Sequence, residues 1–118
     1  MNALYITLIL LGSALIGYLF GSISNGIIIS KIKYKKDPRD YGSHNSGGTN
    51  VGRTFGLKMG LLTIALDILK TIIPIWTVYF VLSKTSLSSF NVTEYGYLIC
   101  CVTCLLGHCF PIYHNFKG

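Results

Sequence analysis

Charged side chains are scarce in this sequence. Asp, Glu, Lys and Arg make up 12% of its 118 residues, about half of their share in an average soluble domain. Residues 1–30 contain none of them, residues 59–83 contain only Asp67 and Lys70, and residues 95–116 contain none. Each stretch is about as long as the roughly 20 residues that a helix needs to cross the hydrocarbon core of a membrane. This scarcity argues against a soluble domain and predicts an integral membrane protein.

Acidic residues are the rarest charged group, 4 against 10 Lys and Arg, which gives a net charge of +6. Most of the basic residues fall between the first two apolar stretches: Lys31, Lys33, Lys35, Lys36, Arg39, Arg53 and Lys58. This cluster is short and adjoins a predicted span, so we attribute it to anionic lipid headgroups and expect no nucleic-acid partner. The positive-inside rule then predicts residues 31–58 in the cytoplasm and the amino terminus outside.

The four cysteines lack the usual setting of a metal site. Cys100, Cys101, Cys104 and Cys109 all lie in the third apolar stretch, and Cys101 with Cys104 forms a C-x-x-C. A zinc or redox site would need further ligands in a polar loop, and a helix holds these sulfurs on different faces. We interpret them as small apolar residues and expect neither a metal nor a cofactor.

These patterns predict an all-α integral membrane protein with three transmembrane helices, as part of a larger polytopic helical bundle. The single membrane domain, residues 1–118, is expected to contain helices at about 4–31, 56–82 and 94–112, a cytoplasmic loop over 32–53 and a Ser-rich turn near 83–91. The first stretch lacks a basic start and a cleavage site, so we expect a retained span rather than a secretory signal. Its many small residues favour close helix packing.

Residues 42–50 read Gly-Ser-His-Asn-Ser-Gly-Gly-Thr-Asn, with Arg39 before them and Arg53 after them. Such a loop cannot face lipid, because lipid leaves backbone N–H groups unsatisfied. Glycines let a backbone approach an anion closely, and arginines offer bidentate donors to phosphate. The spacing matches neither nucleotide-binding glycine motif. Two interpretations stay open at this point, a phosphate-binding loop and a flexible polar connection.

A second polar group ends the third stretch, where Gly107, His108 and Pro111 precede Phe116-Lys117-Gly118. Three antiparallel spans predict that this end returns to the cytoplasmic side. There His108 is a candidate proton carrier or phosphate donor, or else a structural hydrogen-bonding residue. Asp67 and Lys70, one turn apart within the second span, are interpreted as an i,i+3 pair that neutralises itself.

Taken in order, these motifs resemble the integral-membrane acyl-phosphate:glycerol-3-phosphate acyltransferases of bacterial phospholipid synthesis. The resemblance begins with Gly-Ser-Ile-Ser at 21–24 and Asp-Pro-Arg at 37–39, and it is strongest over 42–53. Asp67-Ile-Leu-Lys70 resembles the family's D-x-x-K, and residues 107–111 with 116–118 resemble the opening of its second motif. His44 and Gly48 differ from the family's usual Gly and Ala. The family pattern continues beyond Phe-Lys-Gly, so we expect further helices, in this protein or in a partner.

The resemblance implies a multi-pass protein of the bacterial cell membrane that transfers a fatty acyl group from acyl phosphate to the 1-hydroxyl of glycerol 3-phosphate. It implies catalytic roles for Ser43 and Arg53, to which we add His108 as the candidate proton carrier or phosphate donor described above. The residues expected to bind substrate or phosphate are Arg39, Gly42, Asn45, Gly47, Thr49, Asn50 and Lys117. The expected partners are acyl phosphate, glycerol 3-phosphate and membrane lipid. A non-catalytic membrane subunit with an anion-binding loop, or a truncated paralogue of that kind, is the alternative.

Overall fold

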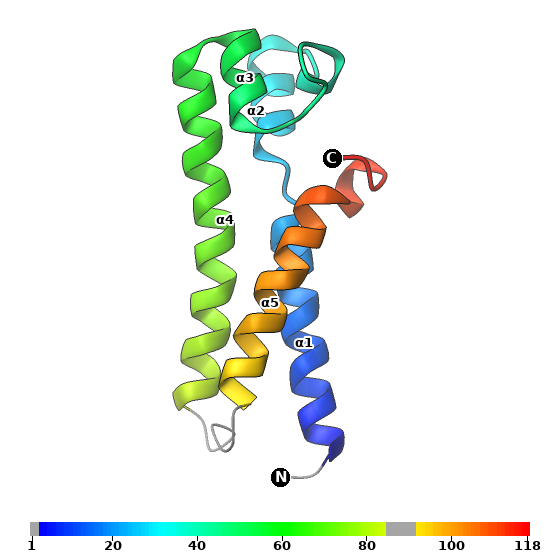
Figure 1. Cartoon of the computed structure of the whole chain (residues 1–118), viewed down its shortest axis with the longest axis vertical. Helices are drawn as coiled ribbons and strands as arrows, with labels where there is room; N and C mark the ends of the chain where they lie inside the picture. The colour runs from blue at the N-terminus through cyan, green and yellow to red at the C-terminus, as the bar shows by residue number, and fades with distance from the viewer. Residues whose placement is uncertain (1–2, 85–91) are drawn as a thin grey trace. The chain divides into compact units, whose positions relative to one another are not determined.

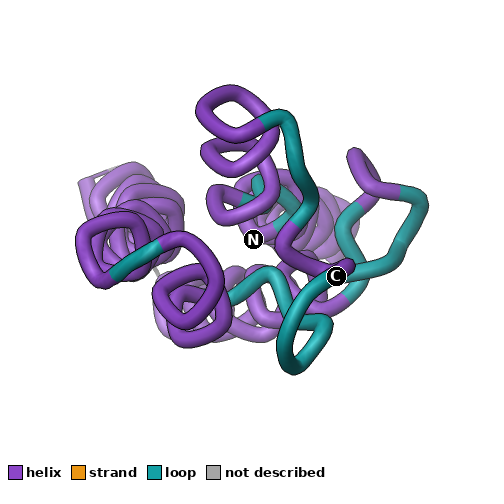
Figure 2. Tube along the Cα trace, turned by 90° about the horizontal axis from the view of Figure 1, so that it is seen from above, coloured by secondary structure: helices purple, strands orange, loops and turns teal. Residues whose placement is uncertain are grey.

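The computed structural model describes residues 3–84 and 92–118, and every regular element in them is helical (Figure 1). The helices are α1 (Ala3–Gly21), α2 (Asn25–Tyr34), α3 (Gly48–Phe55), α4 (Leu57–Lys84) and α5 (Val92–Cys109), with short 3-10 helices η1 (Pro38–Asp40) and η2 (Ile112–His114). Loops and turns join the elements from α1 to α4 and α5 to η2 (Figure 2). Residues 85–91 of the predicted Ser-rich turn lie outside the described residues.

Three segments are long and apolar enough to cross a membrane: Ala3–Tyr34, Leu57–Lys84 and Val92–His114. The predicted all-helical class with three spans is therefore confirmed. Many large apolar side chains on these segments are exposed, among them Leu8, Leu11, Leu15, Ile68, Ile72, Leu98, Val102 and Leu105. Surfaces of this kind suit contact with lipid tails rather than with water.

The first span is not the single helix predicted over 4–31. It divides into α1 and α2 around residues 22–24, where the amide of Ser22 donates to the carbonyl of Tyr18 and that of Ile23 to the carbonyl of Phe20. The side-chain hydroxyl of Ser22 also donates to the Tyr18 carbonyl, at 2.8 Å. Serine side chains that bond to nearby backbone groups compete with helical hydrogen bonds, which helps to end α1 here.

One compact unit contains residues 3–23, 70–84 and 92–117. In it α1 packs beside α5, and a Cβ atom at Gly17, Gly21 or Gly107 would overlap backbone atoms of the opposite helix or its end (Figure 1). Small residues let helix backbones approach closely in membranes. A core of Val78, Leu82, Val92 and Cys100 adds apolar packing.

The other compact unit contains residues 24–69, which form α2, η1, α3 and the first part of α4. Ile27 and Val51 are fully buried in it, and the rings of Tyr34 and Phe55 stack with centroids 4.6 Å apart. The segment 32–53, predicted as a loop, holds the end of α2, η1 and most of α3. The Gly-rich motif thus runs from a loop into a helix, whose first residue is Gly48.

Candidate functional site

Asn50 organises the Gly-rich segment. Its side chain is 1% exposed, and its amide nitrogen donates to the carbonyl oxygens of Pro38 at 2.8 Å, Tyr41 at 3.0 Å and Asn45 at 2.8 Å. Its amide oxygen accepts from the backbone N–H of Ser43 at 3.0 Å. The amide has two N–H donors for these three carbonyl oxygens, so one hydrogen is shared between two of them, and its oxygen is also used. Asn50, predicted to bind substrate, is therefore engaged with the loop backbone in the described structure.

Two residues of the motif adopt left-handed backbone conformations. Gly42 has φ +56°, and a Cβ atom there would overlap the amide oxygen of Asn50. His44 has φ +61°, which histidine tolerates better than most residues. Its Nδ1 lies 2.9 Å from the carbonyl oxygen of Arg39. Since a carbonyl oxygen only accepts, Nδ1 carries the hydrogen of this bond.

The first turn of α3 presents backbone donors next to exposed side chains. Gly47 precedes the helix, and its own N–H donates to the side-chain oxygen of Asn45 at 2.9 Å. The first N–H groups of a helix have no partner within it, and they attract anions together with the helix dipole. Ser43, Thr49 and Arg53 are exposed. Within the described residues the Arg53 guanidinium has no hydrogen bond or ion pair, so it is available to an anion.

Arg39, by contrast, is paired with Asp37. Its Nε donates to the two carboxylate oxygens at 3.0 and 3.1 Å. Its Nη2 donates to Oδ2 of Asp37 at 2.6 Å. This hydrogen-bonded pairing lowers the pKa of Asp37 and raises that of Arg39. The Asp37 carboxylate also accepts the backbone N–H of Arg39 at the start of η1. Arg39 was predicted to bind substrate, and in the described structure its guanidinium stabilises η1.

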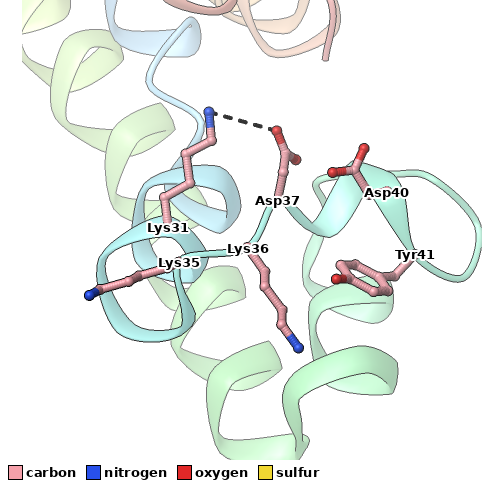
Figure 3. A pocket seen from close by; sticks show the side chains of 6 residues that line it. All are labelled: Lys31, Lys35, Lys36, Asp37, Asp40 and Tyr41. Atoms are coloured by element: carbon pink, nitrogen blue, oxygen red, sulfur yellow. Dashed lines mark ion pairs between the residues drawn. The ribbon is translucent and has the colours of Figure 1, made fainter.

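A pocket of about 560 Å³ adjoins η1 (Figure 3). Its lining residues are Lys31, Lys35, Lys36, Asp37, Asp40 and Tyr41. The ammonium of Lys31 lies 3.8 Å from the Asp37 carboxylate, and the ammonium of Lys36 lies 5.8 Å from the centre of the Tyr41 ring. The two carboxylates offset part of the lysine charge, so this pocket is less suited to an anion than its lysines alone suggest.

His108 is held by a buried lysine. The Lys70 side chain is 6% exposed, and its ammonium lies 2.9 Å from Nδ1 of His108. The same ammonium donates to the carbonyl oxygens of Gly21 at 3.0 Å and Ile23 at 2.8 Å. Lysine near a helix C-terminus satisfies carbonyls that have no partner within the helix. Lys70 thus connects the end of α1 to His108 on α5.

Neighbouring contacts fix the end of α5. The hydroxyl of Tyr18 donates to the carbonyl of Phe110 at 2.6 Å, and the backbone N–H of Ile112 lies 3.4 Å from the Ser22 hydroxyl. Lys117, predicted to bind phosphate, is exposed after η2, and its backbone N–H donates to the carbonyl of His114. The α5 end is thus anchored close to His108.

The predicted site residues fall into the two compact units. Residues 24–69 contain those of the Gly-rich segment: Arg39, Gly42, Ser43, Asn45, Gly47, Thr49, Asn50 and Arg53. His108 and Lys117 belong to the unit of α1 and α5. The described residues hold no group of three or more His, Cys, Asp or Glu side chains arranged to bind a metal.

The sequence analysis missed the role of Lys70 and the partner of Asp67. Asp67 accepts a hydrogen bond from the side chain of Asn25 at 3.0 Å. The pairing of the two ionisable residues with each other stays a prediction. The structure adds a partner for each of them, Asn25 for Asp67 and the carbonyl oxygens of Gly21 and Ile23 for Lys70. A buried ammonium needs several acceptors, which was a signal that Lys70 has partners besides Asp67. The sequence does not identify them, because Gly-Ser-Ile-Ser at 21–24 could equally belong to a continuous membrane helix.

Residues 11–118 match the family described as glycerol-3-phosphate acyltransferase. The chain is 42% identical over 106 residues to glycerol-3-phosphate acyltransferase 1 of Lactobacillus acidophilus, covering 90% of this chain and 47% of that protein. It is 49% identical over 116 residues to the glycerol-3-phosphate acyltransferase of Mycoplasmopsis pulmonis, covering 96% and 48%. The chain spans about half the length of the curated relatives it matches.

Solved structures agree with these relatives. A crystal structure of PlsY, an integral membrane glycerol 3-phosphate acyltransferase, in its glycerol 3-phosphate form superimposes with a TM-score of 0.71 at 36% identity, covering 92% of this chain and 50% of PlsY. The lysophosphatidic acid form gives a TM-score of 0.64 at 35% identity, covering 92% and 48%. With its three apolar helices, the chain is a multi-pass membrane protein.

Proposed function

Because the chain belongs to the glycerol-3-phosphate acyltransferase family, we propose that its protein transfers a fatty acyl group from acyl phosphate to the 1-hydroxyl of sn-glycerol 3-phosphate. The products are lysophosphatidate and inorganic phosphate. The names of the relatives support the acceptor, and the two PlsY forms carry the acceptor and the product. The observation that carries the proposal for this chain is the ordered segment 42–53, which holds exposed anion-binding groups on a fixed backbone.

Arg53 is the phosphate clamp in this proposal. Its guanidinium is exposed and has no ionic partner within the described residues, in contrast to that of Arg39. A planar fork of N–H donors matches two phosphate oxygens at once. Arg53 lies on α3, and the first backbone N–H groups of that helix create a positive electrostatic potential that favours an anion. The short helix therefore supplies both the backbone donors and the charged side chain.

Four other residues of the segment contact the substrate in this proposal: Ser43, Asn45, Gly47 and Thr49. Gly42 and Gly47 let the backbone approach the phosphate. Asn50 and Arg39 contribute by holding the loop, through the bonds to the carbonyls of 38, 41 and 45 and through the pair with Asp37. Lys117 binds phosphate from the segment after α5.

The chemistry needs alignment more than activation, since an acyl phosphate is already an activated donor. The acceptor hydroxyl attacks the carbonyl carbon, the bond from that carbon to the phosphate oxygen breaks, and the hydroxyl proton passes to the departing phosphate. The protein then gains rate by orienting the two substrates and by stabilising the negative charge on the carbonyl oxygen and the phosphate. His108 is the further catalytic residue in this proposal.

We propose that the reaction takes place at the cytoplasmic face of the bacterial cell membrane, and the distribution of lysines supports this side. Lys31, Lys33, Lys35 and Lys36 follow the first span, which favours the cytoplasm for residues 31–58 and the outside for the amino terminus. The acyl tail lies along the exposed apolar helix surfaces.

The experiment that tests the proposal measures phosphate release by the purified protein in lipid bilayers. We expect release from acyl phosphate to require glycerol 3-phosphate and to be matched by lysophosphatidate. Acyl phosphate that binds without turnover in the presence of the acceptor would contradict the enzyme and favour a binding subunit.

A further inference from the structure

We propose that Lys70 is a positioning residue that fixes the imidazole of His108 in the tautomer with its hydrogen on Nε2. In this form His108 acts as a hydrogen-bond donor and not as a proton acceptor. The tautomer follows from the contacts of Lys70, and only the role as a donor rests on the proposed function.

The contacts of Lys70 lie within one compact unit. Gly21, Ile23, Lys70 and His108 all belong to the unit that contains α1 and α5. The ammonium has acceptor atoms at 2.8, 2.9 and 3.0 Å, two of them carbonyl oxygens and one of them Nδ1 of His108. An ammonium has three N–H donors and no acceptor, so it can donate one hydrogen to each of these three atoms.

The direction of the third bond decides the tautomer. The two carbonyl oxygens can only accept, so two N–H donors of Lys70 point to Gly21 and Ile23. With a charged ammonium the third donor points to Nδ1, which must offer its lone pair. A neutral imidazole carries one hydrogen, and that hydrogen is then on Nε2. A doubly protonated ring has no lone pair and does not fit beside this donor.

The other arrangement is a neutral lysine that accepts a hydrogen from Nδ1. The position of Lys70 argues against it, because the C-terminal end of α1, where Gly21 is the last residue, carries the negative end of the helix dipole. A cation is favoured there, and the side chain is 6% exposed, so few water molecules can replace the carbonyls.

The ring is also held in place. Gly107 precedes His108, and a Cβ atom at Gly107 would overlap the carbonyl oxygen of Tyr18 and the backbone nitrogen of Ser22. The Tyr18 hydroxyl binds the carbonyl of Phe110 two residues beyond His108, at 2.6 Å. The backbone on both sides of His108 is thus anchored to the end of α1, which keeps Nδ1 facing Lys70.

A histidine in this state cannot take the proton of the acceptor hydroxyl at Nε2, because that atom already carries a hydrogen. It can donate to an oxygen that gains negative charge during acyl transfer. This agrees with a route in which the departing phosphate takes the proton. It also separates the candidate roles of His108, since it excludes the proton carrier and keeps the hydrogen-bond donor.

The tautomer is tested by magic-angle-spinning NMR of the protein with ¹⁵N-labelled histidine in lipid bilayers at neutral pH. The chain has three histidines, and His108→Gln identifies the His108 signals by their loss. We expect a bare Nδ1 and a protonated Nε2. A hydrogen on Nδ1, alone or together with one on Nε2, would overturn the proposal.

Two variants test whether Lys70 causes this state. Lys70→Met keeps the length of the side chain without its donors, and we expect a population with the hydrogen on Nδ1 to appear. Lys70→Arg keeps donors and charge and should retain the original signals. Helix content measured by circular dichroism identifies a variant that fails to fold, and in that case the reading on the unmodified protein decides. Identical His108 signals in folded Lys70→Met would contradict the proposal.

The role as a donor is tested by turnover. Gln places an amide N–H near the position that Nε2 occupies in histidine, but it cannot act as a base. Ala can neither donate a hydrogen bond nor act as a base. We expect His108→Ala to lose about a hundredfold in turnover, as for removal of an oxyanion donor, and His108→Gln to lose less than about tenfold. Equal losses would contradict the donor role. If the unmodified protein shows no turnover, the proposed function and the donor role fail together, while the NMR result still decides the tautomer.

Discussion

In each compact unit, one buried side chain donates hydrogen bonds to backbone carbonyls at a helix end or in a loop, but the two units pack differently. In the unit of α1 and α5, helices meet through glycines, and one buried lysine binds the carbonyls of residues 21 and 23. In the unit of residues 24–69, one buried asparagine binds the carbonyls of residues 38, 41 and 45. A charged donor serves a helix end, where the dipole favours it, and a neutral amide serves a loop next to a predicted anion site.

This difference shows how each unit keeps its functional groups available. In the proposed site, a second fixed positive charge in the loop would compete with Arg53 for the phosphate, whereas a neutral amide does not. Because Asn50 rather than an arginine bonds the loop carbonyls, Arg53 stays exposed. The charge of Arg39 is neutralised by Asp37. In the other unit, Lys70 donates to carbonyl oxygens of the protein, and in our proposal it also orients His108. Three substitutions test the comparison, from the largest expected effect to the smallest.

Asn50→Asp should have the largest effect, because it replaces the amide donors with a carboxylate facing three carbonyl oxygens. We expect a loss of about 3 kcal/mol in local stability. That corresponds to about a hundredfold faster hydrogen exchange of the amides in residues 38–53.

The control for Asn50→Asp is Asn45→Asp, which keeps the oxygen that accepts from Gly47. We expect its exchange to change by less than threefold, as for a surface substitution worth about 0.5 kcal/mol. If both variants exchange alike, Asn50 does not organise the loop.

Gly21→Ala tests the close packing in the other unit. A Cβ atom there would overlap the carbonyl oxygen of Cys104, which is backbone and cannot turn aside. We expect a loss of about 2 kcal/mol in the free energy of unfolding, and a lower melting temperature by circular dichroism in detergent micelles.

Gly12→Ala is the matched control in the same helix, because nothing lies within 4 Å of a Cβ atom at Gly12. Its melting temperature should stay the same or rise slightly, since alanine favours helix over glycine. Equal losses from the two variants would show that helix propensity, and not the contact between α1 and α5, controls the result.

The smallest expected effect is the loss of stability in Asp37→Asn, which should depend on pH. Because pairing with Arg39 lowers the pKa of Asp37 in the folded protein, the pair stabilises the fold above the unfolded pKa of about 3.9. This stability is lost as the pH falls below that value and through the lowered folded pKa. We expect Asp37→Asn to cost about 1 kcal/mol at pH 6 and almost nothing at pH 2. A cost that is the same at both pH values would contradict the pair as its source.

The sequence was sufficient for the class of fold. Long stretches with few charged residues require helices in lipid, and the described residues contain three helical segments long and apolar enough to span a membrane. The interruption after Gly21 could not be predicted, because glycine and serine are common in continuous membrane helices. Its stabilisation comes from Lys70, which lies 49 residues away in the sequence. Local composition does not reveal a partner at that distance.

The location of the candidate site in the Gly-rich segment stays a prediction, whereas the structure does show which of its polar side chains turn inward. Glycines and hydroxyl residues between arginines indicated an anion site, but they do not tell which polar groups turn inward. Asn50 and Arg39 looked equivalent to Asn45 and Arg53 in the sequence. The structure distinguishes these residues. Asn50 is buried and bonded to loop carbonyls, and Arg39 is paired with the Asp37 carboxylate.

The most direct test of the central claim, that the ordered loop presents Arg53 as a phosphate clamp, is the rate of phosphate release by Arg53→Lys in lipid bilayers. Lysine keeps the charge but lacks the bidentate fork. We predict that turnover with acyl phosphate and glycerol 3-phosphate falls about a hundredfold, while hydrogen exchange in residues 38–53 stays as in the unmodified protein. Full turnover by Arg53→Lys would contradict the clamp and with it this account of the loop.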